Sequence, residues 1–197
     1  MSQVEILIEK PLIRAIKGDI TDQDTDAVVN AANSSLLGGG GVDGAIHSRG
    51  GPRILEECRK VRQRHWPNGL PPGKAVATTA GNLKARYVVH TVGPVWHGGE
   101  LGEAEILAEC YRSCLEVARE MGLRSISFPS ISTGAYGFPI ERACPIALRT
   151  VHESLARHLT PGLDGGGIAV PLTEVRFVLF NGHDLEFYLA QLDKLFA

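Results

Sequence analysis

The chain has 197 residues, of which 44% are hydrophobic and 21% are charged. This composition is typical of a globular protein and argues against a disordered chain. The length fits one domain, so we expect a single domain over residues 1–197. The 20 Lys and Arg residues are outnumbered by 22 Asp and Glu residues. The resulting net charge of −2 disfavours a nucleic-acid partner, because nucleic-acid-binding modules usually carry a basic surplus.

The N-terminal residues and the cysteines indicate where the protein works. Glu5 and Glu9 interrupt the first ten residues, which therefore lack the apolar core of a signal peptide. No apolar run is long enough to span a bilayer, so we expect a cytoplasmic protein without a membrane partner. No two cysteines show Cys-x-x-Cys spacing, and we expect buried, reduced thiols. These cysteines are Cys58, Cys110, Cys114 and Cys144.

The first part of the chain predicts short strands and a turn. Isoleucines within residues 6–8 and 13–16 predict two strands, which Pro11 separates. Residues 18–21 (Gly-Asp-Ile-Thr) predict a turn. Residues 26–30 (Asp-Ala-Val-Val-Asn) predict a buried strand, because their branched side chains are adjacent.

The rest of the chain predicts loops, helices and further strands. Residues 30–41 are dense in Asn, Ser and Gly, which predicts a loop. Residues 42–62 predict a helix that breaks before Pro52, a residue that suits the first turn of the next helix. Helical spacing over residues 103–121 ends at Gly122, a typical C-terminal cap. Other strands are expected at residues 74–79, 87–92, 125–128 and 175–180, and other helices at residues 140–158 and 185–196.

This alternation of strands and helices predicts an α/β protein with a largely parallel sheet. Residues 160–171 hold two prolines and three consecutive glycines, which predicts a surface loop. A strand and a helix are expected after this loop, so it does not mark a domain boundary.

The four consecutive glycines within residues 38–44 (Gly-Gly-Gly-Gly-Val-Asp-Gly) predict a phosphate or diphosphate site. Glycines let backbone N–H groups approach an anion closely, and the helix that follows adds its N-terminal partial charge. Such a site needs no arginine cluster. The Gly-x-Gly-x-x-Gly spacing is a weak dinucleotide signal here, because a loop separates it from the strand and the nearest later acids come too early. The alternative is a flexible surface turn.

Polar residues on both sides of this glycine run are candidates for the same site. Asn30 and Asn33 end a buried strand, and α/β sheets bind ligands at strand ends. Asp43 precedes His47 by one helical turn, so the two side chains could share a face. Together they could form a pair that acts as a general base, or a metal site. The alternatives are an acid favoured by a helix start and a hydrogen-bonded packing histidine. No third metal-type residue has fitting spacing, so we expect no metal.

Longer segments of the chain resemble the macrodomain family. These segments are most similar to the MacroD-type branch of the family, and especially to bacterial O-acetyl-ADP-ribose deacetylases. It implies a three-layer α/β/α sandwich around a mixed, largely parallel sheet. It also implies an ADP-ribose cleft at the ends of the central strands. The segments that carry the resemblance are residues 17–21, 26–33, 38–47, 90–96 and 129–139.

The resemblance implies a role for each residue of the cleft. Asp19 would accept a hydrogen bond from the adenine amino group, and the Ile20 backbone would read the adjacent ring nitrogen. Asn181 would face the adenosine, whereas Phe180 before it could be a core residue. The residues expected around the diphosphate and the distal ribose are Asn30, Gly40, Gly41, Val42, Ser130, Ser132, Thr133, Gly134, Ala135 and Tyr136.

Asn33 and Asp43 match the positions that define the hydrolytic branch of the family. The implied reaction is hydrolysis of ADP-ribose esters, both O-acetyl-ADP-ribose and mono-ADP-ribose on Asp or Glu side chains of proteins. Asn33 would orient the distal ribose, and Asp43 would position or deprotonate the attacking water. In a rival arrangement a substrate phosphate oxygen orients the water and Asp43 steers the ribose. Neither arrangement needs a metal or another cofactor.

Three other functions stay open at the level of sequence. The chain could read ADP-ribose or its polymer without turnover, since fold does not fix function. It could remove the phosphate of ADP-ribose 1″-phosphate in the same pocket, or bind RNA. The combination of Asn33 with Asp43 favours the hydrolase. The expected partners are therefore ADP-ribose, its esters and mono-ADP-ribosylated proteins.

Overall fold

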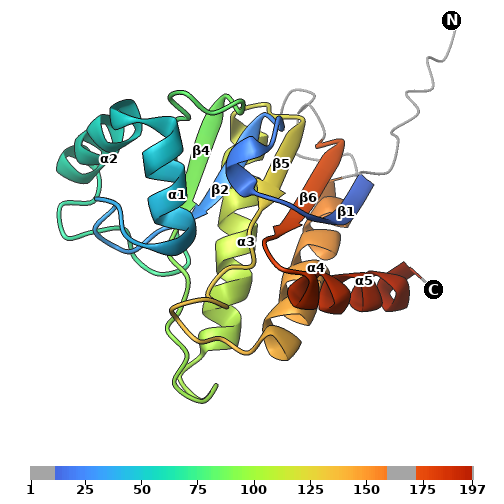
Figure 1. Cartoon of the computed structure of the whole chain (residues 1–197). Helices are drawn as coiled ribbons and strands as arrows, with labels where there is room; N and C mark the ends of the chain where they lie inside the picture. The colour runs from blue at the N-terminus through green and yellow to red at the C-terminus, as the bar shows by residue number, and fades with distance from the viewer. Residues whose placement is uncertain (1–11, 159–171, 197) are drawn as a thin grey trace, which may run out of the picture.

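The computed structural model describes residues 12–158 and 172–196, which form an α/β structure around one sheet (Figure 1). The strand predicted at residues 6–8 and the loop predicted at 160–171 lie outside the described residues. The strands are β1 (Leu12–Lys17), β2 (Ala27–Ala31), β3 (Ala75–Thr79), β4 (Tyr87–Thr91), β5 (Ser125–Phe128) and β6 (Glu174–Leu179). Their order in the sheet is β1-β6-β5-β2-β4-β3.

The sheet is mixed, because its edge strand β3 runs antiparallel to β4 while every other pair is parallel. The helices are α1 (Gly41–Gly50), α2 (Pro52–Arg64), α3 (Glu103–Glu120), α4 (Ile140–His158) and α5 (Gly182–Phe196). A short 3-10 helix, η1 (Ile20–Asp22), follows β1 at the predicted turn. These bounds confirm the predicted alternation, the break before Pro52 and the cap at Gly122, whose φ is 64°.

Both faces of the sheet are covered by helices, as the predicted sandwich requires. Along β2 and β4, Val28 and Val88 point into an apolar cluster with residues of α1 and α2. Val29 and Val89 point to the opposite face, where α3, α4 and α5 complete a larger cluster. The two groups of helices are separate in Figure 1. The side chains alternate because successive residues of a strand face opposite sides.

The cysteines are buried free thiols within the described residues, as predicted. Cys58 belongs to the cluster under α1 and α2, and Cys110, Cys114 and Cys144 belong to the other cluster. Among the described helices, none has the length and apolar composition needed to cross a membrane.

Candidate functional site

The parallel strands all end at the same edge of the sheet, and the predicted site residues gather there. The segments after β1, β2, β5 and β6 carry these residues, and α1 begins beside them. Loops at this edge are where open α/β sheets bind ligands. The structure therefore brings together the predicted residues Asp19, Ile20, Asn30, Asn33, Gly40, Gly41, Val42, Asp43, Ser130, Ser132, Thr133, Gly134, Ala135, Tyr136 and Asn181.

Asp19 lies at the β1 side of this edge and caps η1. Its Oδ1 accepts hydrogen bonds from the Thr21 amide at 2.8 Å and from the Thr21 hydroxyl at 2.6 Å. The hydroxyl bond, with the amide bond and Arg49 adding to it, holds the pKa of Asp19 below its ordinary value. Asp19 is thus an ionised acceptor at neutral pH. Ile20 packs its side chain into the apolar cluster under α1 and α2, so only its backbone is available to a ligand.

Phe180 contradicts the expectation of a core residue, because it is 82% exposed. It follows Leu179, the last residue of β6, whose carbonyl accepts a hydrogen bond from the Gly18 amide at 2.9 Å. Phe180 therefore leaves the sheet next to the segment that carries Gly18 and Asp19, and its side chain is in solvent. The prediction failed because the strand ends at Leu179, and the burial that its apolar pattern implies ends with it. The sequence did contain a signal for an exposed Phe180, namely an aromatic residue directly before a loop at the end of a strand.

Asn181 is exposed and already has a structural role. Its Oδ1 accepts a hydrogen bond from the Asp184 amide at 2.8 Å, and its Nδ2 donates to Asp184 Oδ2 at 3.1 Å. This is the geometry of an N-terminal cap, and it explains why α5 begins at Gly182 instead of residue 185. The ligand contact of Asn181 stays a prediction.

The glycine run leaves the start of α1 open. Gly40 caps the helix without a side chain, and a Cβ added to Gly40 or Gly41 would meet no atom within 4 Å. Gly41 has a φ of 58°, a conformation that favours glycine. The first amides of a helix lack intrahelical partners, and no side chain crowds this helix start, so an anion could bind there. Val42, the next residue, is half-buried.

Gly39 brings the backbone between the two predicted catalytic side chains. A Cβ added there would lie 3.0 Å from Asp43 Oδ2 and 3.1 Å from Asn33 Nδ2. The Asn33 amide holds its own loop, because Nδ2 donates to the Gly38 carbonyl and Oδ1 accepts from the Ser35 amide, each at 2.9 Å. Asn33 is thereby fixed in place close to Asp43.

Asp43 is a carboxylate with only 4% of its surface exposed. Its Oδ1 accepts a hydrogen bond from Asn30 Nδ2 at 2.6 Å, and His47 Nε2 lies 3.4 Å from the same oxygen. The shared helix face of Asp43 and His47 is thus confirmed. Within the described residues Oδ2 is buried without a hydrogen-bond partner. A buried carboxylate oxygen without a partner is costly, so a donor supplied by water or a ligand would stabilise it.

The loop after β5 forms the other wall of the site. Ser132 has a φ of 67°, and its buried Oγ has no partner among the described residues. A Cβ added to Gly93 would lie 2.1 Å from this Oγ, so only glycine fits at that position. Backbone hydrogen bonds from Phe138 to the Ser132 carbonyl and from Trp96 to the Tyr136 carbonyl hold the loop in place.

The remaining residues of this wall differ in exposure. Ser130 is tied inward, because its Oγ accepts from the Tyr188 hydroxyl at 3.3 Å and its carbonyl accepts from the Thr133 hydroxyl at 3.1 Å. Gly134 and Ala135 are exposed, and Tyr136 is half-buried. Their amides and the Tyr136 ring are therefore placed at the surface of the site and not in the core.

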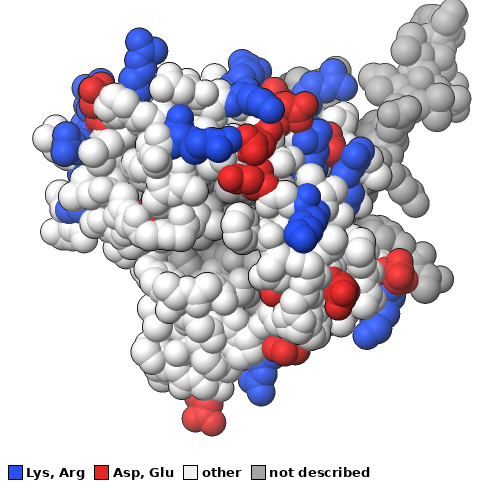
Figure 2. Space-filling model, viewed as in Figure 1, with Lys and Arg blue, Asp and Glu red and all other residues white. Residues whose placement is uncertain are grey.

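The part of the site between the start of α1 and the loop after β5 carries almost no charged side chains. Figure 2 shows a hollow between the start of α1 and the loop after β5, and its walls are almost entirely uncharged. An anion in this hollow would be held by backbone amides and not by lysine or arginine. A separate concavity of about 530 Å³ lies near Thr79 and Tyr87, at the opposite end of β3 and β4 from the site edge. It contains none of the predicted site residues.

Comparison with known proteins identifies the family. The model of the family described as Macro domain matches residues 29–147. The chain belongs to the macro domain family. A macro domain-containing protein of Streptomyces griseus is 56% identical over 88% of this chain and 90% of its own length. An O-acetyl-ADP-ribose deacetylase of Enterobacter cloacae is 48% identical over 91% of this chain and 92% of its own length.

Solved macrodomain structures confirm the fold. The Oceanobacillus iheyensis macrodomain with ADP matches with a TM-score of 0.81 and 42% identity, over 92% of this chain and 90% of that one. The Trypanosoma brucei macrodomain in complex with ADP-ribose matches with a TM-score of 0.77 and 40% identity. That match covers 91% of this chain and 68% of the other. The predicted α/β sandwich is therefore confirmed both by the sheet and by these relatives.

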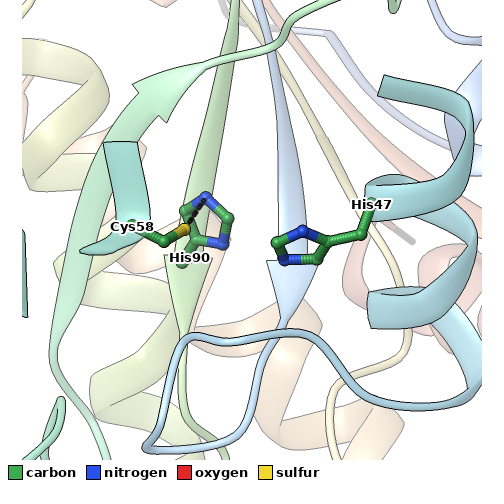
Figure 3. A group of neighbouring side chains, drawn as sticks. All are labelled: His47, Cys58 and His90. Atoms are coloured by element: carbon green, nitrogen blue, oxygen red, sulfur yellow. Dashed lines mark hydrogen bonds between the residues drawn. The ribbon is translucent and has the colours of Figure 1, made fainter. Parts of the chain in front are cut away.

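Behind the site of this macrodomain lies a cluster that the sequence spacing did not reveal. His47 of α1, Cys58 of α2 and His90 of β4 offer ligand atoms within 4.8 Å of one another (Figure 3). A metal ion would nevertheless have to displace existing contacts. His90 Nδ1 lies 3.1 Å from Asn30 Nδ2, and His90 Nε2 lies 2.8 Å from Thr78 Oγ1.

The protonation states in this cluster also suit a neutral network. Burial, with smaller contributions from Asp43 and Glu57, raises the pKa of the Cys58 thiol to about 12. Burial, followed by the influence of His47, lowers the pKa of His90 to about 3. Cys58 is thus a thiol and His90 a neutral imidazole at physiological pH. These two residues form a buried hydrogen-bonded network, in which Cys58 Sγ lies 3.7 Å from His90 Nε2.

Proposed function

We propose that this chain binds ADP-ribose and hydrolyses its esters, O-acetyl-ADP-ribose and mono-ADP-ribose on Asp or Glu side chains of proteins. The observation that carries the proposal is the buried Asp43 carboxylate. Its Oδ2 has no partner among the described residues and faces Gly39, next to the open start of α1. The relative named as an O-acetyl-ADP-ribose deacetylase, and relatives solved with ADP or ADP-ribose, support the substrate class.

The diphosphate would lie between the start of α1 and the loop after β5. The amides of Gly41 and Val42 have no intrahelical partners, and the partial positive charge of the helix start favours an anion there. The near absence of charged side chains from the hollow supports this mode of binding, because the donors would then be backbone amides and hydroxyl groups.

The adenine would lie at the β1 and β6 side of the edge. Asp19 accepts hydrogen bonds only, so it favours a base that carries an amino group. Phe180, exposed beside it, offers an aromatic face on which the base could stack. Asn181 borders the same place.

The distal ribose and its ester would lie beside Asn33 and Asp43. Asn33 would orient the ribose hydroxyls, and Asp43 Oδ2 would accept a proton from water as that water attacks the ester. General-base assistance of this kind contributes about 10²–10⁴-fold to a rate. The rival arrangement, with a substrate phosphate oxygen orienting the water, keeps the same binding site and assigns Asp43 to the ribose.

The proposal is tested by offering the purified protein O-acetyl-ADP-ribose, Glu-ADP-ribosylated protein and ADP-ribose 1″-phosphate in separate reactions. Release of ADP-ribose from the first two substrates supports the hydrolase. Binding of ADP-ribose without release identifies a reader instead, and release from the third substrate alone identifies a phosphatase. Asp43→Asn should abolish most of the turnover, whereas the matched control Asp193→Asn, at an exposed position of α5, should not.

A further inference from the structure

A row of buried polar groups crosses the face of the sheet under α1 and α2. Asn30 of β2 and His90 of β4 are direct neighbours in the parallel register, and both are 0% exposed. The residues two positions earlier on the same face are Val28 and Val88, which are apolar. Buried polar side chains in such a setting are costly unless they hydrogen-bond, so the partners of Asn30 and His90 define what the row does.

The donors and acceptors of this row fit together in one way. An asparagine amide has two N–H donors, and Asn30 Nδ2 directs them to Asp43 Oδ1 at 2.6 Å and to His90 Nδ1 at 3.1 Å. His90 Nδ1 must therefore accept, which places the ring proton on Nε2. That N–H donates to Thr78 Oγ1 at 2.8 Å, and the Thr78 hydroxyl donates to the Thr79 carbonyl at 3.0 Å.

The opposite arrangement of the Asn30 amide conflicts with the position of the Asp43 carboxylate, whose Oδ1 lies 2.6 Å from Asn30 Nδ2. Rotation of the Asn30 amide by half a turn would bring its Oδ1 against Asp43 Oδ1, and neither atom could donate. A protonated His90 ring would turn an N–H toward an amide N–H of Asn30, and the low pKa of His90 keeps the ring neutral. The titratable groups beside this ring are His47 of α1 and Cys58 of α2 (Figure 3). Asp43 of α1 is connected to the ring through Asn30.

We propose that His90 is a positioning residue of the hydrolytic site. Its Nδ1 holds the Asn30 amide so that an N–H binds Asp43 Oδ1 and leaves Oδ2 turned toward Gly39 and the ligand. This inference rests on the proposed function, and it adds a residue that lies behind the site without touching the substrate. Thr78 completes the row, because its Oγ1 accepts the hydrogen bond from Nε2–H and so fixes the tautomer of the ring.

The experiment compares three substitutions that separate the two ring nitrogens. His90→Asn can present an acceptor near the place of Nδ1, His90→Gln reaches only toward the place of Nε2, and His90→Leu removes both polar groups. Loss of positioning should lower kcat for ester hydrolysis by about 10- to 100-fold in the Gln and Leu variants. The Asn variant should retain much more of the wild-type kcat, and the dissociation constant for ADP-ribose should change by less than about twofold in all three.

A merely structural role for His90 would give a different ranking. The Asn variant leaves the largest cavity, so kcat that follows the melting temperature across the three variants overturns the proposal. Equal losses in the Asn and Gln variants, or a parallel loss of ADP-ribose affinity, also overturn it. The cluster is a metal site instead if the purified protein contains stoichiometric zinc and a chelator abolishes turnover until zinc is restored.

The ¹⁵N NMR signals of the His90 ring decide the matter even if the wild-type protein shows no turnover. The proposal requires a single Nε2–H tautomer in the wild type. In Asp43→Asn, the Asn30 amide is free to turn either way, so both tautomers should appear. A wild-type ring protonated on Nδ1, or a tautomer mixture that Asp43→Asn does not change, overturns the positioning role. Absence of turnover with the expected tautomers contradicts the proposed function alone.

Discussion

Two carboxylates stand at opposite ends of the site, and the structure treats them differently. Asp19 is half-buried at the rim, and its Oδ1 is occupied by the amide and hydroxyl of Thr21. Asp43 is buried, and it has one oxygen on Asn30 and the other without a partner among the described residues. A carboxylate in a turn at the rim suits recognition of a ligand. A buried carboxylate with one oxygen held by a hydrogen bond and the other available suits catalysis on that ligand. The two ends should therefore fail in different ways when they are altered.

The largest expected effect is the loss of ADP-ribose binding when the start of α1 is altered. This helix start lies between the two ends of the site. Gly41→Glu places a negative charge where the backbone would meet the diphosphate, and ADP-ribose binding should vanish in calorimetry. No atom lies within 4 Å of a Cβ at this position, so the Glu side chain has room, and the strain comes from the backbone conformation alone. Gly41→Ala is the matched control, because it shares the cost of a φ of 58° without the charge. Full affinity in the Glu variant would show that the glycine run is only a turn.

The next effect sharpens the chemical end. Asp43→Ala and Asn33→Ala should each slow ADP-ribose release from an ester by about 10²-fold or more. Product affinity should change much less, because the adenine and diphosphate contacts are untouched. The double variant should lose little more than either single variant, because both side chains position the same ribose and water. Wild-type turnover in Asp43→Ala would make Asp43 a helix-start acid only.

The recognition end should lose affinity and not turnover. Asp19→Ala should weaken ADP-ribose binding by about 1–3 kcal/mol, because the adenine amino group loses a charged acceptor. Asp19→Asn separates this loss from capping, since asparagine is also a favourable N-terminal cap. We expect it to keep the melting temperature while it loses affinity. Unchanged affinity in calorimetry for both variants would remove Asp19 from the base site.

The smallest effect concerns Phe180. If its exposed ring stacks on the base, Phe180→Ala should weaken ADP-ribose binding by about 0.5–1.5 kcal/mol, and Phe180→Tyr should retain the affinity. Because the side chain is 82% exposed, the melting temperature should be unchanged in both variants. Equal affinities of the Ala and Tyr variants would mean that the ring does not contact the ligand.

Local pattern was enough to predict most of the fold. The apolar patterns along the chain predicted the order of the strands and helices. Pro52 and Gly122 indicated two helix boundaries, because their backbone preferences act locally. The start of α5 was missed, since it depends on whether the Asn181 side chain turns back to the Asp184 amide. Phe180 was missed because exposure at a strand end depends on where the strand stops.

The site was predictable only as far as its residues lie in continuous motifs. Asn33, Asp43 and the glycine run are close in sequence, so their proximity could be expected. His90 lies 60 residues from Asn30, and it becomes its neighbour only through the parallel register of β2 and β4. Cys58 and Thr78 reach the same ring from α2 and β3. No spacing rule connects four separate elements, which is why this network emerged only from the fold.

The left-handed conformation of Ser132 affects the rate at which a ligand associates with the site. A residue other than glycine in this conformation costs about 1–3 kcal/mol, and the surrounding fold must hold it there. The close fit of its hydroxyl against Gly93, and the amide of Phe138 on its carbonyl, do so before any ligand arrives. The loop after β5 then loses little conformational entropy when the ligand binds. Stopped-flow traces should accordingly show one fast bimolecular phase for ADP-ribose, without a slower rearrangement of the loop.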